Sequence, residues 1–277
     1  MFATDFIYDN IQLSSKGYIV CDFDSPSGVN VIDIGSNISF NKIKRDSGRV
    51  FSLASATYEE CVTATFDICK DDEKFDRSNM GLSTEEFREI VQWLNRREFL
   101  PFRIIDKNET VCWYNASFNV DKIVIGNKIC GARLTMETDR PFGYGDKVTK
   151  KYVLNSPNPG VGVINTSNEI GYLYPIVIIK CLVDGDLTIT NRLEECATVI
   201  KKCSSAEVIT LNGETQTIET SKENNHTKNK IHNDFNWEFP RLGIKMSRGQ
   251  VIRNNLIATS MPCEMTIEFR PIVKDVP

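Results

Sequence analysis

Few residues of this sequence could do acid–base, metal or nucleophilic chemistry. Its two histidines, His226 and His232, lie in one polar stretch with Lys228 and Lys230 between them. A zinc site built on this pair would need two more ligands from elsewhere in the chain. A histidine that acts as general base must also be oriented in a cleft beside its nucleophile, and nothing around this pair indicates burial. We therefore expect both histidines to be solvated loop residues.

Other motifs that carry chemistry are equally weak. The acidic runs have no calcium-loop spacing, and we interpret them as charged turns: Glu59-Glu60, Asp71-Asp72-Glu73 and Glu194-Glu195. Gly160-Val161-Gly162 lacks the third glycine and the βαβ context of a dinucleotide site, so it predicts a turn. The sequence contains no GxxxxGK[ST] phosphate loop. We predict no catalytic, cofactor-binding or metal-binding residues, and no enzymatic activity.

Aromatic side chains offer one further kind of site, because a ring can stack on a sugar or a nucleobase. The candidates are Trp113, Tyr114, Trp237 and Phe239. All four lie in stretches that alternate like β-strands, where aromatic residues most often fill the core. We therefore expect them to be core residues.

Length and composition set the broad class. A chain of 277 residues predicts about two domains, and each half can bury enough surface for its own core. The formal net charge of −4 gives no overall basic field for nucleic acid. The nine cysteines are odd in number and contain no CxxC pair, which favours free thiols over a disulfide framework. The start of the chain lacks the apolar segment of a signal peptide, and no aliphatic run is long enough to cross a bilayer, so we expect no membrane partner.

One stretch predicts a long helix. Ser83 and Glu86 have the spacing of a capping box, in which each side chain satisfies a backbone N–H at the helix start. Apolar residues then recur at helical spacing and form one buried stripe: Phe87, Ile90, Val91 and Leu94. Arg96 and Arg97 are expected to complement the helix dipole at the other end. Two strand-like runs follow, at residues 102–106 and 110–118, so we expect the helix to pack on a sheet.

The remainder of the chain reads as short strands separated by turn signals. In the first half the runs cover residues 6–13, 18–23, 29–34, 38–40, 49–56, 61–69 and a 122–136 hairpin around Gly126-Asn127. In the second half they cover residues 152–154, 161–165, a 176–191 hairpin around Asp184-Gly185, a 207–220 hairpin around Asn212-Gly213, 235–239, 250–254 and 265–269. Residues 221–234 form a polar stretch that we expect to be mobile.

These patterns predict a mainly β protein with one main α-helix. The Pro- and Gly-rich segment at residues 137–146 predicts the boundary between an N-terminal domain, 1–145, and a C-terminal antiparallel β-sandwich, 146–277.

Several short structural signatures without catalytic content follow one another over nearly the whole length of the chain. They are residues 5–13 with Gly17 and 21–24, 86–94 with 102–106 and 114–115, 137–141, 174–176 with 187–191, 213–214, 235–242 and 268–271. Their order along the chain resembles the phage distal tail proteins, the tail and baseplate hub family often called Dit.

This resemblance implies a fold and a role. The N-terminal domain is expected to be β-sandwich-like and to assemble into a hexameric ring, and the C-terminal domain to be galectin-like. Such a ring would join the tail tube protein to tail-tip proteins and offer a platform to receptor-binding proteins, in the tail tip or baseplate of the virion. DNA would pass through its channel without specific binding.

Three functional hypotheses remain. The first is a structural, non-enzymatic tail hub. The second is a carbohydrate-binding host-recognition protein, in which the C-terminal sandwich uses Trp237 or nearby aromatics; a galectin-like fold alone does not confer sugar binding. The third, a tail-associated hydrolase, is disfavoured because no acid–base pair or nucleophile can be assembled.

Overall fold

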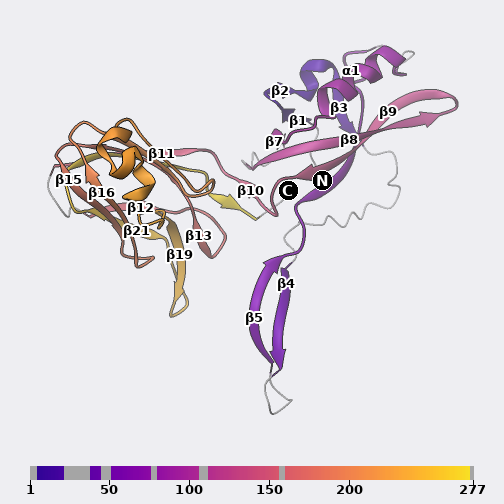
Figure 1. The fold of residues 1–277 in the computed structure, drawn as a ribbon. Coiled ribbons are helices and arrows are strands. Elements are labelled where there is room, and N and C mark those ends of the chain that lie inside the picture. Colours follow the sequence, from indigo (N-terminus) through magenta and orange to yellow (C-terminus); the bar gives the residue numbers. More distant parts are fainter. Residues whose placement is uncertain are drawn as a thin grey trace. The chain divides into compact units, whose positions relative to one another are not determined.

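The computed structural model describes residues 5–21, 38–44, 51–75, 80–105, 112–155 and 160–274. Antiparallel strands dominate these residues, together with a single α-helix, α1 (Thr84–Leu94), so the predicted mainly β class with one helix is confirmed. The chain divides into two compact units, Met1–Tyr144 with Val273–Pro277, and Gly145–Ile272. Figure 1 shows their elements. The strand expected at residues 29–34 lies outside the described residues.

The first unit is built on a large antiparallel sheet with the order β2-β1-β7-β8-β9-β6-β3. Its strands are β1 (Asp5–Tyr8), β2 (Ile11–Gln12), β3 (Tyr18–Cys21), β6 (Thr63–Lys70), β7 (Leu100–Ile105), β8 (Trp113–Ile125), β9 (Lys128–Thr138) and, off this path, β10 (Gly143–Tyr144) and β23 (Ile272–Val273). The hairpin between β8 and β9 turns at Gly126 and Asn127, whose φ angles are 56° and 68°. Two positive φ angles are what a type I′ turn requires, so the predicted Gly-Asn turn is confirmed.

The helix α1 begins as predicted. The Glu86 backbone N–H donates to Ser83 Oγ at 3.1 Å, and the Ser83 N–H donates to Glu86 Oε2 at 2.7 Å. The same Glu86 carboxylate pairs at 2.8 Å with the ammonium of Lys70, which is almost fully buried and also donates to Gly81 O at 2.9 Å. This lysine therefore ties the first turn of the helix to β6.

The far end of α1 partly differs from the prediction. The helix ends at Leu94 with Asn95 as its C-cap, so its last turn holds no basic residue. Arg96 lies just beyond this end, and its Nε donates to Trp93 O at 3.2 Å, so this arginine does interact with the C-terminal end of the helix. Trp93, absent from the predicted stripe, is buried, whereas Val91 is only half-buried. The buried face of the helix includes Trp93 because the indole ring of this residue contacts an aromatic cluster on the sheet.

That cluster forms the centre of the first core. Phe6 of β1 stacks on Trp93 with ring centroids 5.9 Å apart and meets Phe102 at 5.5 Å. Phe118 of β8 packs edge-on against Phe102 at 5.2 Å. Aromatic pairs in such geometries contribute about 0.5–1.5 kcal/mol beyond the area they bury. The complete cluster is Phe6, Tyr8, Phe66, Trp93, Phe102 and Phe118.

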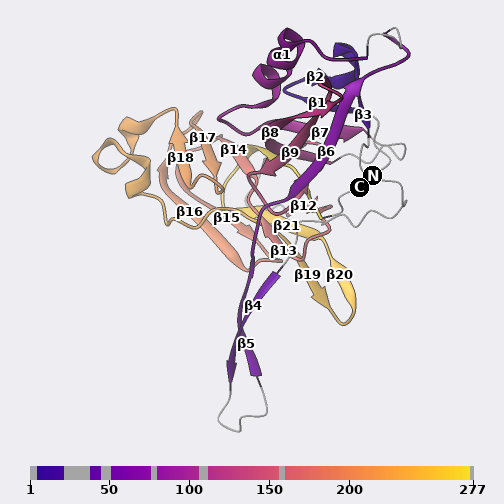
Figure 2. The same cartoon turned by 90° about the vertical axis from the view of Figure 1, so that its right-hand side faces the viewer.

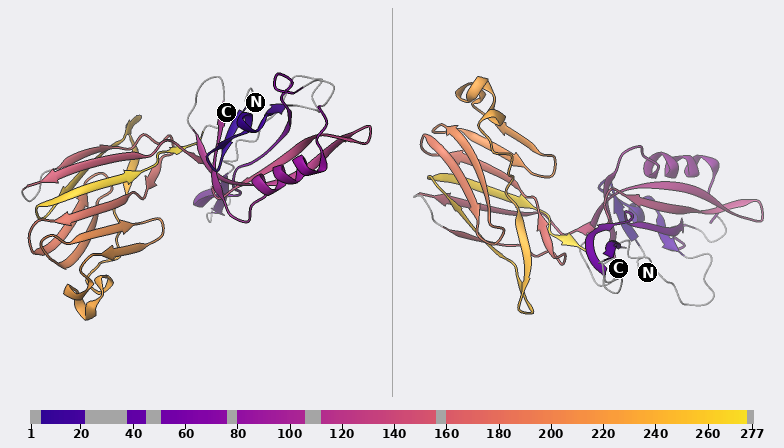
Figure 3. Two further views of the ribbon diagram at one scale, coloured as in Figure 1. Left: turned by 90° about the horizontal axis from the view of Figure 1, so that it is seen from above. Right: turned by 60° about the horizontal axis from the view of Figure 1, so that its bottom comes forward.

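The second unit is a β-sandwich (Figure 3). One sheet has the order β11-β22-β14-β17-β18 and the other β12-β21-β15-β16, with a smaller sheet β13-β19-β20 beside them. The strands are β11 (Val148–Leu154), β12 (Val161–Ile164), β13 (Gly171–Leu173), β14 (Ile176–Cys181), β15 (Gly185–Asn191), β16 (Cys196–Cys203), β17 (Val208–Asn212), β18 (Thr217–Thr220), β19 (Leu242–Ser247), β20 (Gln250–Ile252), β21 (Asn254–Thr259) and β22 (Cys263–Phe269). Alternate residues of β14 and β22 are buried, as expected for strands that line a sandwich core.

Two predicted hairpins of this unit need correction. Strands β14 and β15 do not pair, because β14 lies between β17 and β22, whereas β15 lies between β16 and β21 in the other sheet. The prediction failed because the same turn residues occur in hairpins and in connections between two sheets. The β17–β18 hairpin exists, but residues 213–216 form its loop, and the Asn212 side chain accepts the Glu214 N–H at 3.1 Å in place of a two-residue turn.

A buried asparagine joins the small sheet to the sandwich. Asn255 of β21 is fully buried; its Oδ1 accepts the Gly243 N–H at 2.7 Å, and its amide donates to Gly243 O at 3.0 Å. Asn191 donates to the same Oδ1 at 2.8 Å. Unpaired buried amides are costly, so this network specifies where β19 crosses β21.

We predict that Phe6→Ala destabilises the first unit by about 3–5 kcal/mol, because it opens a cavity at the centre of the aromatic cluster. Phe99→Ala is the matched control: that ring is 48% exposed, so its loss should change stability by less than about 0.5 kcal/mol. Denaturant unfolding followed by tryptophan fluorescence compares them. Equal destabilisation by the two substitutions would contradict the role of Phe6.

Candidate functional site

The two histidines have opposite environments. His232 is exposed, as expected, but His226 is buried with a side chain that water does not reach, so its prediction as a solvated residue is wrong. Its Nε2 lies 2.8 Å from Glu207 Oε1 and its Nδ1 lies 3.2 Å from Asp234 Oδ2. The ring is thus held between two carboxylates that are themselves almost fully buried.

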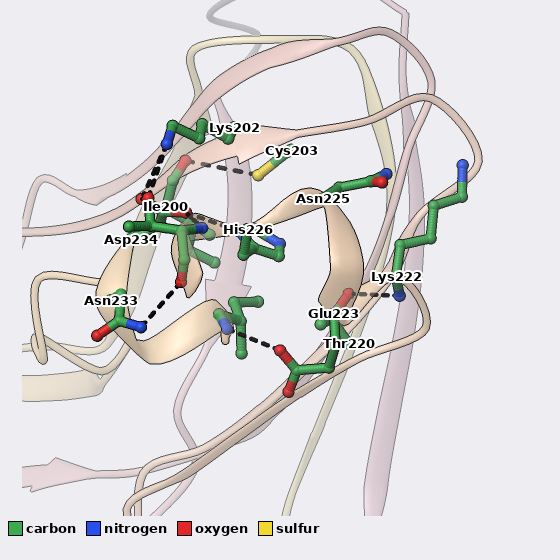
Figure 4. Close-up of polar contacts among 12 residues, drawn as sticks. Ile200, Lys202, Cys203, Thr220, Lys222, Glu223, Asn225, His226, Asn233 and Asp234 are labelled. Atoms are coloured by element: carbon green, nitrogen blue, oxygen red, sulfur yellow. Dashed lines mark hydrogen bonds and ion pairs between the residues drawn. The ribbon is translucent and has the colours of Figure 1, made fainter. Parts of the chain in front are cut away.

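The stretch at residues 221–234 is ordered around this ring, contrary to the mobile loop that we expected. It forms three 3-10 turns, η3 (Glu223–Asn225), η4 (Thr227–Asn229) and η5 (Ile231–Asn233). Figure 4 shows polar contacts within this stretch and to its neighbours. Asp234 accepts both the N–H and the hydroxyl of Thr227 at 2.7 Å. Glu223 accepts the Ile231 N–H at 2.8 Å. Polar composition misled the prediction because several of these polar groups bond to one another and hold the stretch in place.

Both carboxylates are held in their charged form. Burial alone would raise the pKa of Glu207, but hydrogen bonds from Thr220, His226 and the Ser204 backbone outweigh it and lower that pKa. Burial would also raise the pKa of Asp234, but hydrogen bonds from Thr227 and His226 and the positive charge of Lys202 outweigh it and lower that pKa. Both ring nitrogens of His226 are occupied, so the cluster acts as a structural clamp.

The other candidate residues are not brought together. Glu59 and Glu60 are exposed, Asp71 is buried near Lys74, and Glu194 pairs with Arg241 at 3.5 Å. Among the described residues no group of histidine, cysteine and acidic side chains is arranged to hold a metal ion. All nine cysteines are free thiols. No helix in the described part of the chain is long and apolar enough to span a bilayer.

The Gly160 and Gly162 positions serve close packing. A Cβ at Gly160 would lie 2.8 Å from the Leu256 side chain, and one at Gly162 would lie 2.8 Å from Asn254 Oδ1. These glycines let β12 approach β21.

The aromatic candidates separate into core and surface. Tyr114 and Phe239 are buried as expected, and Trp113 is half-buried. Trp237 is 57% exposed, so its prediction as a core residue is wrong. Residues 235–239 form no strand, because Trp237 has a φ of 61°, which no extended chain adopts.

The hairpin of β4 (Ile38–Lys44) and β5 (Phe51–Tyr58) has an apolar face that is exposed in the described residues. Figure 2 shows the two paired strands. In the described residues these strands pair only with each other. The register places Phe40 and Ala56, Lys42 and Leu53, and Lys44 and Phe51 opposite one another. Residues opposite each other share a face, so Phe40, Leu53 and Phe51 lie on one side together with Lys42 and Lys44. Each of the three apolar side chains is more than half exposed.

The reverse face of the hairpin is mainly polar, with Ser39, Asn41, Ser52, Ser55 and Thr57 beside a single Ile43. At its base Tyr58 packs against Phe142 with ring centroids 6.1 Å apart, which anchors the hairpin to the first unit. An isolated two-stranded hairpin is marginally stable in water, and large exposed apolar patches mark contact sites. The strand alternation was visible in the sequence, but whether another element covers the apolar face was not.

Replacing His226 with alanine is predicted to destabilise the second unit by about 3–5 kcal/mol, because two buried carboxylates lose their common partner. His232→Ala removes an exposed ring and should change stability by less than about 0.5 kcal/mol. Thermal and denaturant unfolding of both variants measures the difference. A His226→Ala chain as stable as the wild type would show that the clamp does not support the fold.

Acid should weaken the same unit. In the unfolded chain Asp and Glu titrate near pH 4, and in the fold the pKa values of Glu207 and Asp234 are lower. Their stabilisation is therefore complete above about pH 4 and is lost as the pH falls through the folded pKa values. Melting temperatures below about pH 4 should fall less steeply in Glu207→Gln than in the wild type; identical slopes would contradict this linkage.

Comparison with known proteins agrees with the resemblance found in the sequence. Two family models match, "Phage tail protein N-terminal domain" over residues 1–140 and "Phage tail C-terminal domain" over residues 142–269. Comparison with curated protein sequences finds no significant match.

Among solved structures, the chain is similar to SPP1 Dit (gp 19.1), described as a paradigm of the hub adsorption apparatus in phages that infect Gram-positive hosts. The TM-score is 0.63 at 13% identity, covering 96% of this chain and 98% of that one. At this identity the likeness shows a shared fold, which confirms the sequence-based resemblance at the level of architecture. With both domains matched, the chain belongs to a phage tail protein family.

Proposed function

We propose that this protein is a non-enzymatic distal tail hub, which forms a closed ring of six copies at the tail tip. The observation that carries the proposal is the exposed apolar face of the β4–β5 hairpin, because no described residue of the chain covers Phe40, Phe51 and Leu53. A second copy of the chain is a suitable partner, since head-to-tail contacts that close under rotation generate a ring.

The free edges of β4 and β5 strengthen this reading. An unpaired strand edge can pair with a strand of another chain. In a closed ring, each copy could pair one such edge with its neighbour. The charge of the chain also fits a conduit, since a net charge of −4 does not favour gripping the phosphates of DNA that passes through. We propose that one face of the ring meets the tail tube and the other the tail-tip and receptor-binding proteins.

Light scattering across a concentration series tests the assembly. Six copies of the 31.4 kDa chain would form a closed cyclic species of roughly 190 kDa, with a central hole in negative-stain images. A chain that stays monomeric at every concentration would contradict self-assembly.

Hairpin variants test the contact itself. We predict that Phe40→Ser with Leu53→Ser shifts the mass toward the monomer, because the apolar face loses the surface that it would bury against its neighbour. Asn41→Ser with Ser55→Asn, on the reverse face, is the matched control and should assemble like the wild type. Equal assembly of both double variants would place the contact elsewhere.

A further inference from the structure

Trp237 is a large aromatic residue with an exposed side chain and a strained backbone conformation. Its side chain is 57% exposed and its backbone has a φ of 61°. For a bulky residue this left-handed conformation is a genuine outlier, and holding it costs free energy. Packing against Phe235 still leaves the side chain more than half exposed, so the conformation calls for another explanation.

The residue before Trp237 fixes the strained position. The Asn236 N–H donates to Val199 O at 3.1 Å, its Oδ1 accepts the Val199 N–H at 3.0 Å, and its amide donates to Ala197 O at 2.8 Å. Asn236 is thereby clamped to the edge of β16. The same Oδ1 also accepts the Glu238 N–H at 3.3 Å. Trp237 therefore stands on a short turn that is fixed from both sides.

The indole lies between a buried ring and an exposed one. Phe235 is 5.7 Å from it between centroids, and Phe235 in turn packs edge-on against buried Phe239 at 5.0 Å. On the other side lies His232, 6.4 Å away and tilted by 32°. The adjoining Ile231 is fully buried, and its N–H bonds to Glu223. The result is a rigid exposed aromatic surface with a polar imidazole beside it.

We propose that Trp237 and His232 form a binding site for a sugar ring of a polysaccharide. A pyranose presents a face of C–H groups with positive partial charge, which the negative face of an indole attracts. Its hydroxyl groups need donors and acceptors at the rim, and an imidazole supplies one of each. The site belongs to the second unit alone and does not require a ring of copies.

A printed array of hexose, hexosamine and N-acetylhexosamine oligosaccharides, probed with the full chain, tests the proposal. We expect saturable binding to at least one oligosaccharide. Titration with that sugar in solution then measures the affinity. Trp237→Ala should weaken binding about tenfold or more, His232→Ala should weaken it less, and Phe99→Ala, which removes an exposed ring of the first unit, should leave it unchanged. Absence of binding to every oligosaccharide, or binding that persists in Trp237→Ala, would overturn the proposal.

A glycine variant separates binding from folding. Trp237→Gly relieves the left-handed strain, so its melting temperature should equal or exceed that of the wild type while sugar binding is lost. A clear fall in melting temperature would show instead that the ring supports the fold, and would overturn its assignment as a ligand surface.

Discussion

An apolar sheet face has to be covered, and this constraint organises the whole protein. In the first unit the helix α1 and the aromatic cluster around Phe6 cover the sheet. In the second unit two sheets cover each other, with alternate residues of β14 and β22 turned inward. The β4–β5 hairpin presents an apolar face that no described residue covers. A structural protein can leave such a face open because assembly with another chain completes its burial.

Buried polar groups decide details that apolar packing leaves open. Asn255 specifies where β19 meets β21, and Lys70 ties the helix start to β6. The His226 clamp orders a loop whose composition resembles that of a disordered segment. In each case the bonds must all be made together, since a single unpaired buried group costs more than one surface contact provides.

The buried histidine belongs to a structural cluster. His226 has both nitrogens occupied by carboxylates, and the described residues contain no group of histidine, cysteine and acidic side chains that could hold a metal ion. Two of the exposed apolar surfaces in the described residues are the hairpin face and the Trp237 turn. We propose the first as a contact for a second protein chain and the second as a surface for a small rigid ligand.

The sequence by itself determined the local elements. The capping box of α1, the Gly-Asn turn between β8 and β9 and the strand alternation all follow from interactions between residues close in the chain. Only the tertiary structure decided which sheet receives β14 or β15, that His226 is buried between Glu207 and Asp234, and that Trp237 and Phe40 face solvent. Those outcomes depend on residues distant in sequence. A local pattern indicates which side chains are suited to burial, whereas the packing of distant segments determines whether they are covered.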